Sequence, residues 1–209
     1  MMRPAMLSAL ALIVLAALVA SSIHPYDRGT WLMEVAPVLI AAPILIATYR
    51  RIPLTQVLYI VIAIHALVLI LGGAYTYARV PLGSWLQDWL GLARNPYDRI
   101  GHFMQGVTPA LLAREIFLRA GYVAGRRMLP FLCVCVALAV SAAYELIEWA
   151  AALALGQGAQ AFLGTQGDPW DTQADMFCAL LGAILSLAVF SRLQDAQIRA
   201  LSTRPVRSL

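Results

Sequence analysis

Three segments of the chain carry histidine or carboxylate side chains at spacings that suit acid–base or metal chemistry. Asp98 and His102 are four residues apart, so on a helix they share a face, where the carboxylate can orient the imidazole. Glu145 and Glu148 are three residues apart and share a helix face in the same way. The third segment contributes Asp175, inside an apolar stretch long enough to span a membrane. An ionisable group within such a stretch is expensive to insert, so these residues are candidates for function.

These residue types predict two overlapping roles. Acid–base catalysis is assigned to His102, Glu145, Glu148 and Asp175. Ligation of a divalent cation is assigned to Asp98, His102, Glu145 and Asp175. Several oxygen ligands with one imidazole favour Mg²⁺, Mn²⁺ or Zn²⁺. Because no Ser-His-Asp arrangement or other known catalytic signature is present, the class of reaction stays open.

Polar residues beside these segments are predicted to bind substrate. They are Arg94, Arg99, Asp168, Trp170 and Asp171. Asp171 is also expected to be the N-cap of the helix that follows it. Carboxylates that gather in one place repel each other, so the cluster needs protons, a cation or the two arginines to balance it.

The elements that position these residues are predicted to be membrane-spanning helices. Hydrophobic residues make up 61% of the 209 residues and charged residues only 12%, a composition that cannot supply the polar surface of a soluble domain. In lipid, apolar stretches of this length must be helices. We therefore expect an all-α polytopic bundle, one integral-membrane domain over 1–209, with a short interfacial helix near 82–92. The six expected spans are approximately 5–23, 31–48, 55–77, 100–119, 129–152 and 173–191.

The arginines orient these six spans. With the N-terminus in the cytoplasm, eleven of the fifteen arginines fall on the cytoplasmic side, as the positive-inside rule requires. These eleven are Arg3, Arg50, Arg51, Arg114, Arg119, Arg126, Arg127, Arg192, Arg199, Arg204 and Arg207. Both termini are then cytoplasmic, and all the candidate site residues lie near the outer boundary. The five tryptophans also fall on that side, at an interface that suits the indole ring.

Several other classes are disfavoured by the pattern of residues. The arginines stand between apolar runs and form no basic patch, so no nucleic-acid partner is expected. Cys133, Cys135 and Cys178 have no CxxC spacing, which disfavours a disulfide framework or a thiolate zinc site. The first apolar stretch has features of a signal peptide, but it is long enough to span, and we expect it to remain uncleaved. His65 is interpreted as a packing residue, and the first three spans are otherwise nearly featureless.

The polar motifs resemble those of the YjdF-like family of predicted bacterial inner-membrane proteins, which has no established activity. The likeness is carried by Tyr97-Asp98-Arg99 with Gly101-His102-Phe103, by Tyr144-Glu145 with Glu148, and by Gly167 to Gln173 with Asp175-Met176. It covers most of the chain and implies a location in the inner membrane of a bacterium. A looser likeness is to the VanZ-like membrane proteins, which place an Asp and a His-Phe pair at the start of one helix, a Glu in the next and an Asp in the last.

Three functions remain open on this evidence. The first is an integral-membrane enzyme that acts on a lipid or cell-envelope substrate, with the bilayer itself as its other partner. The second is a transporter that binds a cation or a proton at the carboxylates. Against transport, the cytoplasmic halves of the spans read as almost wholly apolar, which leaves no path through the membrane. The third is a structural or assembly factor whose polar cluster joins three helices.

Overall fold

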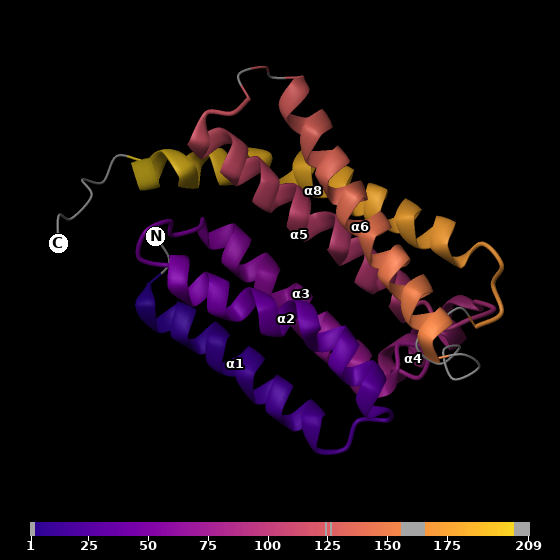
Figure 1. The fold of residues 1–209 in the computed structure, drawn as a ribbon. Helices are drawn as coiled ribbons and strands as arrows, with labels where there is room; N and C mark the ends of the chain where they lie inside the picture. The colour runs from indigo at the N-terminus through magenta and orange to yellow at the C-terminus, as the bar shows by residue number, and fades with distance from the viewer. Residues whose placement is uncertain (1–2, 124, 126, 156–165, 203–209) are drawn as a thin grey trace.

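The computed structural model describes residues 3–123, 125, 127–155 and 166–202, and these residues form seven helices and no strand. The fold is therefore all-α, as predicted, and the long helices lie side by side in one bundle (Figure 1). Arg126, Arg204 and Arg207 lie outside the described residues. The helices are α1 Pro4–Ile23, α2 Arg28–Thr48, α3 Gln56–Tyr75, α4 Pro81–Leu90, α5 Tyr97–Ala120, α6 Met128–Leu155 and α8 Asp171–Ser202.

Five of these helices are long and apolar enough to cross a membrane, namely α1, α2, α3, α6 and α8. Helix α5 has 24 residues, enough to span, but it is the least apolar of the helices and does not count among the five. It lies inside the bundle and packs against α3, α6 and α8 (Figure 1). The short helix expected near 82–92 is present as α4. The last helix runs to Ser202 instead of ending near 191, and at ~1.5 Å per residue it exceeds a hydrocarbon core of ~30 Å.

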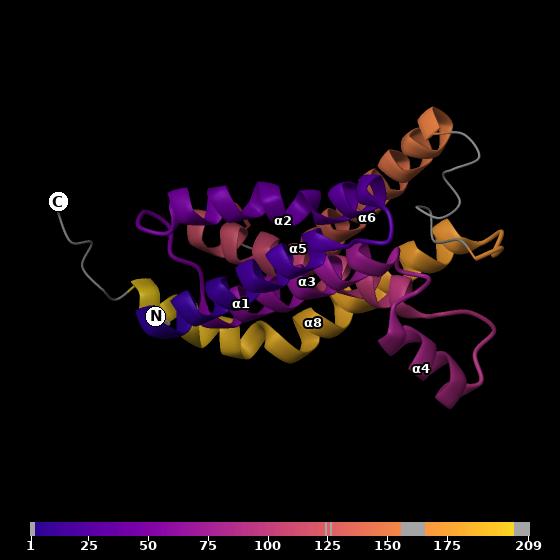
Figure 2. The same ribbon diagram turned by 90° about the horizontal axis from the view of Figure 1, so that it is seen from below.

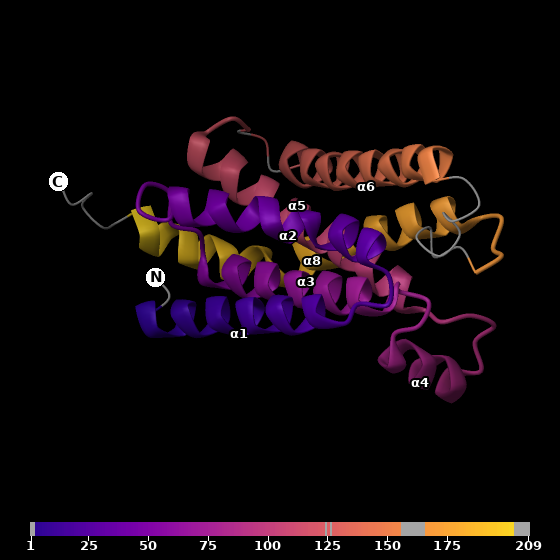
Figure 3. The same cartoon turned by 60° about the horizontal axis from the view of Figure 1, so that its bottom comes forward.

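Helices α5 and α8 pack closely because small residues face each other at their crossing. A Cβ atom on Gly106 would overlap the backbone carbonyl of Ala179, and one on Gly182 would overlap the carbonyl of Phe103. Small residues let membrane helices approach to backbone contact. The two helices start at the same end of the bundle and run in the same direction (Figure 3). Their N-terminal turns, which carry most of the candidate site, are therefore neighbours.

A buried polar network ties the other end of α5 to its neighbours. The Glu115 side chain is 1% exposed. Its carboxylate accepts hydrogen bonds from Thr55 N at 2.9 Å, Thr55 Oγ1 at 2.6 Å, Arg119 at 3.1 Å and Gln194 Nε2 at 3.3 Å. Arg114, also buried, donates to Gln194 at 3.1 Å. The expectation that this half of the bundle is almost wholly apolar was therefore wrong, because these charges are paired inside the protein instead of facing water.

Candidate functional site

The site is centred on His102, which is 5% exposed on the first turns of α5. Its Nε2 atom lies 3.6 Å from Asp98 Oδ1, one turn earlier on the same helix, as their spacing predicted. Its Nδ1 atom lies 3.1 Å from Gln105 Oε1. An amide oxygen can only accept, so Nδ1 donates to Gln105 in this arrangement, and Nε2 faces the Asp98 carboxylate. In the neutral ring, Nε2 then carries the lone pair. The imidazole is thus oriented as a ligand or a base.

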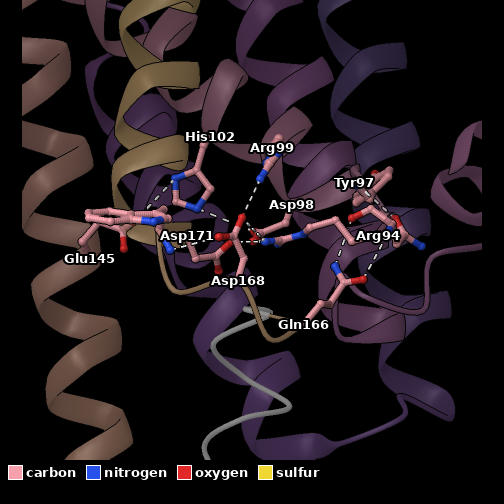
Figure 4. Close-up of polar contacts among 11 residues, drawn as sticks. Arg94, Tyr97, Asp98, Arg99, His102, Glu145, Gln166, Asp168 and Asp171 are labelled. Carbon is pink, nitrogen blue, oxygen red and sulfur yellow. Dashed lines mark hydrogen bonds and ion pairs between the residues drawn. The ribbon is translucent and has the colours of Figure 1, made fainter. Parts of the chain in front are cut away.

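Helix α6 brings a second carboxylate to the same imidazole. Glu145 Oε1 lies 3.7 Å from His102 Nδ1 (Figure 4). The neighbouring Tyr144 ring stands edge-on to the imidazole, with ring centroids 6.2 Å apart. The predicted approach of His102 and Glu145 is confirmed, because α6 packs against α5 and carries Glu145 past the first turns of that helix.

Helix α8 completes the group with Asp175, which is 2% exposed. Asp98, His102 and Asp175 each offer one ligand atom, and these three atoms lie within 4.8 Å of one another. Among the described residues, Asp175 Oδ1 and Glu145 Oε1 are buried without a hydrogen-bond partner. Buried oxygens without a donor are costly and rare in folded proteins. These two atoms therefore lack the partners that a buried carboxylate normally has.

Two arginines connect the cluster to the segment before α8. Arg94 pairs with Asp171, with Asp98 at 3.6 Å and with Asp168 at 3.5 Å, and Arg99 reaches the same Asp168 oxygen at 2.9 Å (Figure 4). Burial opposes the charge of Arg94, but the hydrogen bond and charge of Asp171 outweigh it and raise the guanidinium pKa. Asp171 is the first residue of α8 and not its N-cap, because the carbonyl of the preceding residue, Trp170, accepts the first hydrogen bond of the helix, from Ala174 N. The Asp171 side chain pairs with Arg94 instead.

The segment before α8 covers the buried carboxylates and is held in place by amide contacts. The Gln166 side chain accepts from Asn95 N and donates to Asn95 O, both at 3.0 Å. Trp170 follows, and its side chain is 68% exposed. Of the five predicted substrate-binding residues, Arg94, Asp168, Asp171 and Arg99 therefore meet in one ion-pair network, whereas Trp170 lies on the surface beside it.

A small cavity of about 20 Å³ adjoins the cluster. Such a volume holds a single water molecule, for which roughly 10–15 Å³ is enough. The cavity wall contains Glu148, Asp98, His102, Gln105, Tyr144 and Glu34. Glu148 is buried here, as its spacing from Glu145 predicted. A larger apolar groove of about 690 Å³ lies between α1 and α3, but no carboxylate lines it.

Sequence reasoning missed the contribution of α2. Glu34 is 3% exposed and accepts a hydrogen bond from the Tyr144 hydroxyl at 2.9 Å. The first three spans were expected to be nearly featureless, and that expectation was wrong. A lone carboxylate near the start of the apolar stretch at 31–48 was the available signal. The partner on α6 could not be predicted because it comes from tertiary packing.

Comparison with known proteins places this arrangement among membrane proteins. A family model described as "Predicted membrane protein (DUF2238)" matches residues 6–196. The "Inner membrane protein YjdF" of Escherichia coli (strain K12) is 57% identical to this chain over 198 residues, which cover 95% of each protein. No solved structure matches the chain. The family resemblance in the polar motifs is thereby confirmed, as is a multi-pass protein of the bacterial inner membrane.

Proposed function

The chain belongs to the DUF2238 family of membrane proteins, and we propose that it is an inner-membrane enzyme that holds a divalent cation at Asp98, His102 and Asp175. The observation that carries this proposal is the convergence of the three buried ligand atoms within 4.8 Å of one another. Its substrate is a lipid or a cell-envelope molecule, because the site lies at one end of a membrane bundle.

The contrast between the two buried polar clusters on α5 supports a ligand over a structural role. At Glu115 four donors satisfy the carboxylate, which is the arrangement expected of helix-joining residues. At the other end, Asp175 Oδ1 and Glu145 Oε1 have no hydrogen-bond donor among the described residues. A cluster that only joined helices would gain stability from donors at these atoms, and their absence favours a cation.

The geometry suits a metal between the ligand atoms. Two ligands bound tetrahedrally at ~2.1 Å lie roughly 3.4 Å apart, close to the 3.6 Å between His102 Nε2 and Asp98 Oδ1. Gln105 holds the other ring nitrogen, as outer partners of metal-bound imidazoles do. Two carboxylates and one imidazole fit Zn²⁺ or Mn²⁺, and Mg²⁺ fits if water completes its shell.

The surrounding residues divide the work of such an enzyme. When bound, the cation would supply Lewis acidity toward a substrate oxygen. Glu145, beside His102, is the proposed general base or fourth ligand, and Glu148 borders the cavity sized for one water molecule. Arg94 and Arg99, now paired with Asp168, would bind an anionic part of the substrate once that segment moves away. Trp170, Asp168 and Asp171 form the rim of this entrance.

The proposed topology has six spans, with α5 as the fourth, in one domain over 1–209. Both termini are placed in the cytoplasm, because this orientation puts most of the arginines on the cytoplasmic side. In this orientation the cluster lies at the outer boundary of the inner membrane.

One observation keeps a transporter as the second candidate. His65 Nδ1 lies 3.0 Å from Thr108 Oγ1 midway along α5, between the two polar ends of the bundle. In a transporter, a cation or proton that leaves the cluster toward the Glu115 end of α5 would reach His65 and Thr108 next. Between it and Glu115, however, Ala110 and Leu111 are fully buried and apolar, so the enzyme is favoured.

Liposomes made from total inner-membrane lipids separate the two candidates. With Mn²⁺ present, the enzyme is expected to release lipid products that mass spectrometry detects, and Asp175→Asn should abolish them. Asp88→Asn changes an exposed carboxylate outside the cluster and should retain them. Flux of Mn²⁺ across the same liposomes, lost in Asp175→Asn, would favour the transporter instead. Neither products nor flux would reject both.

A further inference from the structure

Helix α4 presents one apolar face that no part of the described protein covers. Trp85 is 59% exposed and Trp89 is 70% exposed, and their rings stack with centroids 5.8 Å apart. Only Gly83 is buried in this helix. The apolar positions recur at the spacing of one helix face: they are Leu82, Trp85, Leu86, Trp89 and Leu90. A contiguous exposed apolar surface of this kind indicates an interaction site.

The helix is fixed at the corner that precedes α5. A Cβ atom on Gly83 would overlap the Asn95 side chain. Asn95 Nδ2 donates to Val80 O at 3.1 Å and lies 3.3 Å from Ser84 Oγ. The rest of α4 projects away from the bundle (Figure 2). The orientation of α4 is therefore set by Asn95, which directly follows Arg94 of the site.

We propose that α4 docks on the surface of the lipid bilayer through its Trp85 and Trp89 face. The lipid is the occupant because the chain belongs to a family of membrane proteins, and because Trp149 and Trp170 are also exposed at this end, at 61% and 68%. Indole rings favour the headgroup region, and an amphipathic helix lies in that plane with its charged side toward water. Asp88 is on the opposite side of α4. Docking places lipid headgroups beside the entrance to the site, and it goes beyond the proposed enzyme without depending on it.

Tryptophan fluorescence in vesicles tests this docking directly. Replacing Trp31, Trp149 and Trp170 by Phe leaves Trp85 and Trp89 as the only tryptophans, which are excited selectively over the tyrosines. In vesicles of brominated phosphatidylcholine this variant should lose most of its emission relative to unbrominated vesicles, and aqueous acrylamide should have little effect. If the variant does not fold, wild type and Trp85→Phe/Trp89→Phe provide the same information by difference.

The matched control moves the emitter to the opposite face of the same helix. Asp88→Trp, in a background with every native tryptophan replaced by Phe, should be quenched by acrylamide and not by brominated lipid. Equal quenching of the two faces by brominated lipid, or quenching of Trp85 and Trp89 by acrylamide, would overturn the proposal. Protection of Trp85 and Trp89 from both quenchers would also overturn it, because a protein surface would then cover α4.

Discussion

Two buried carboxylates, at opposite ends of the bundle, should respond differently to the same substitution. The sign of the change in stability then distinguishes a ligand site from residues that only join helices. Asp175 and Glu115 are 2% and 1% exposed. Donors surround Glu115, whereas Asp175 Oδ1 has none in the described part of the chain. Replacing each by its amide removes a charge and keeps the shape, so the two changes should have opposite effects on stability.

The magnitudes follow from the contacts. Glu115→Gln loses about two charge-assisted hydrogen bonds and leaves Arg119 without its carboxylate, which should lower the free energy of unfolding by roughly 3–5 kcal/mol. Asp175→Asn removes an oxygen that lacks a donor and lies close to Asp98, so in a chelator it should raise that free energy by about 1–2 kcal/mol. With a cation at about 100 times its Kd, wild type should gain about 2.7 kcal/mol and Asp175→Asn should gain nothing.

Thermal unfolding in detergent, with EDTA and then with excess Mn²⁺, measures these shifts. Destabilisation by Asp175→Asn in EDTA, to the same extent as by Glu115→Gln, would refute the reasoning and return the cluster to a structural role. Equal responses of wild type and Asp175→Asn to Mn²⁺ would do the same.

Three further predictions concern packing, capping and topology. Gly106→Val should prevent recovery of folded, monodisperse protein in size-exclusion chromatography, because its Cβ would overlap the Ala179 carbonyl; normal recovery would contradict the α5–α8 crossing. Asp27→Ala should cost about 1 kcal/mol in thermal unfolding, because its carboxylate caps α2 by accepting from Thr30 N at 2.7 Å. That hydrogen bond lowers the pKa of Asp27 in the folded protein. The stability that Asp27 adds should therefore be complete above its unfolded pKa of 3.8 and be lost as the pH falls through its lower, folded pKa. A stability difference between wild type and Asp27→Ala that does not change with pH would argue against the cap. A phosphatase fused after Leu209 should be inactive, since this reporter folds to its active form only in the periplasm. An active fusion would overturn the proposed topology.

Much of the fold could be predicted because the membrane limits the choices. Apolar stretches of sufficient length must be helices, and α1, α2, α3, α6 and α8 were found close to their predicted positions. The end of α8 was placed too early, because hydropathy marks where lipid ends and not where the helix ends. Once the order of spans was set, Asp98, Glu145 and Asp175 had to lie at one level. Their common depth was therefore predictable from topology, whereas their proximity depends on how closely α5, α6 and α8 pack.

The remaining part of the site depends on side-chain packing that no spacing rule reveals. Gln105 is one turn from His102, but its role as the partner of Nδ1 depends on rotamers. Glu34 reaches Tyr144 only because α2 packs near α6. The cytoplasmic halves of the spans were interpreted as almost wholly apolar, yet the buried Glu115 accepts hydrogen bonds from Thr55, the residue that precedes α3. Tertiary contacts decided all three cases.

The metal content of the purified protein tests the central claim most directly. After exposure to Mg²⁺, Mn²⁺ and Zn²⁺ and removal of free ions, elemental analysis of wild type should find about one divalent cation per chain. His102→Ala removes a ligand and Glu145→Gln removes the adjacent charge, so both should lose the cation. Glu145→Gln also removes a buried oxygen that has no donor in the described part of the chain, so its melting temperature in EDTA should not fall below that of wild type. A metal-free wild type, or unchanged metal content and unchanged cellular phenotype in both variants, would contradict a cation site at Asp98, His102 and Asp175.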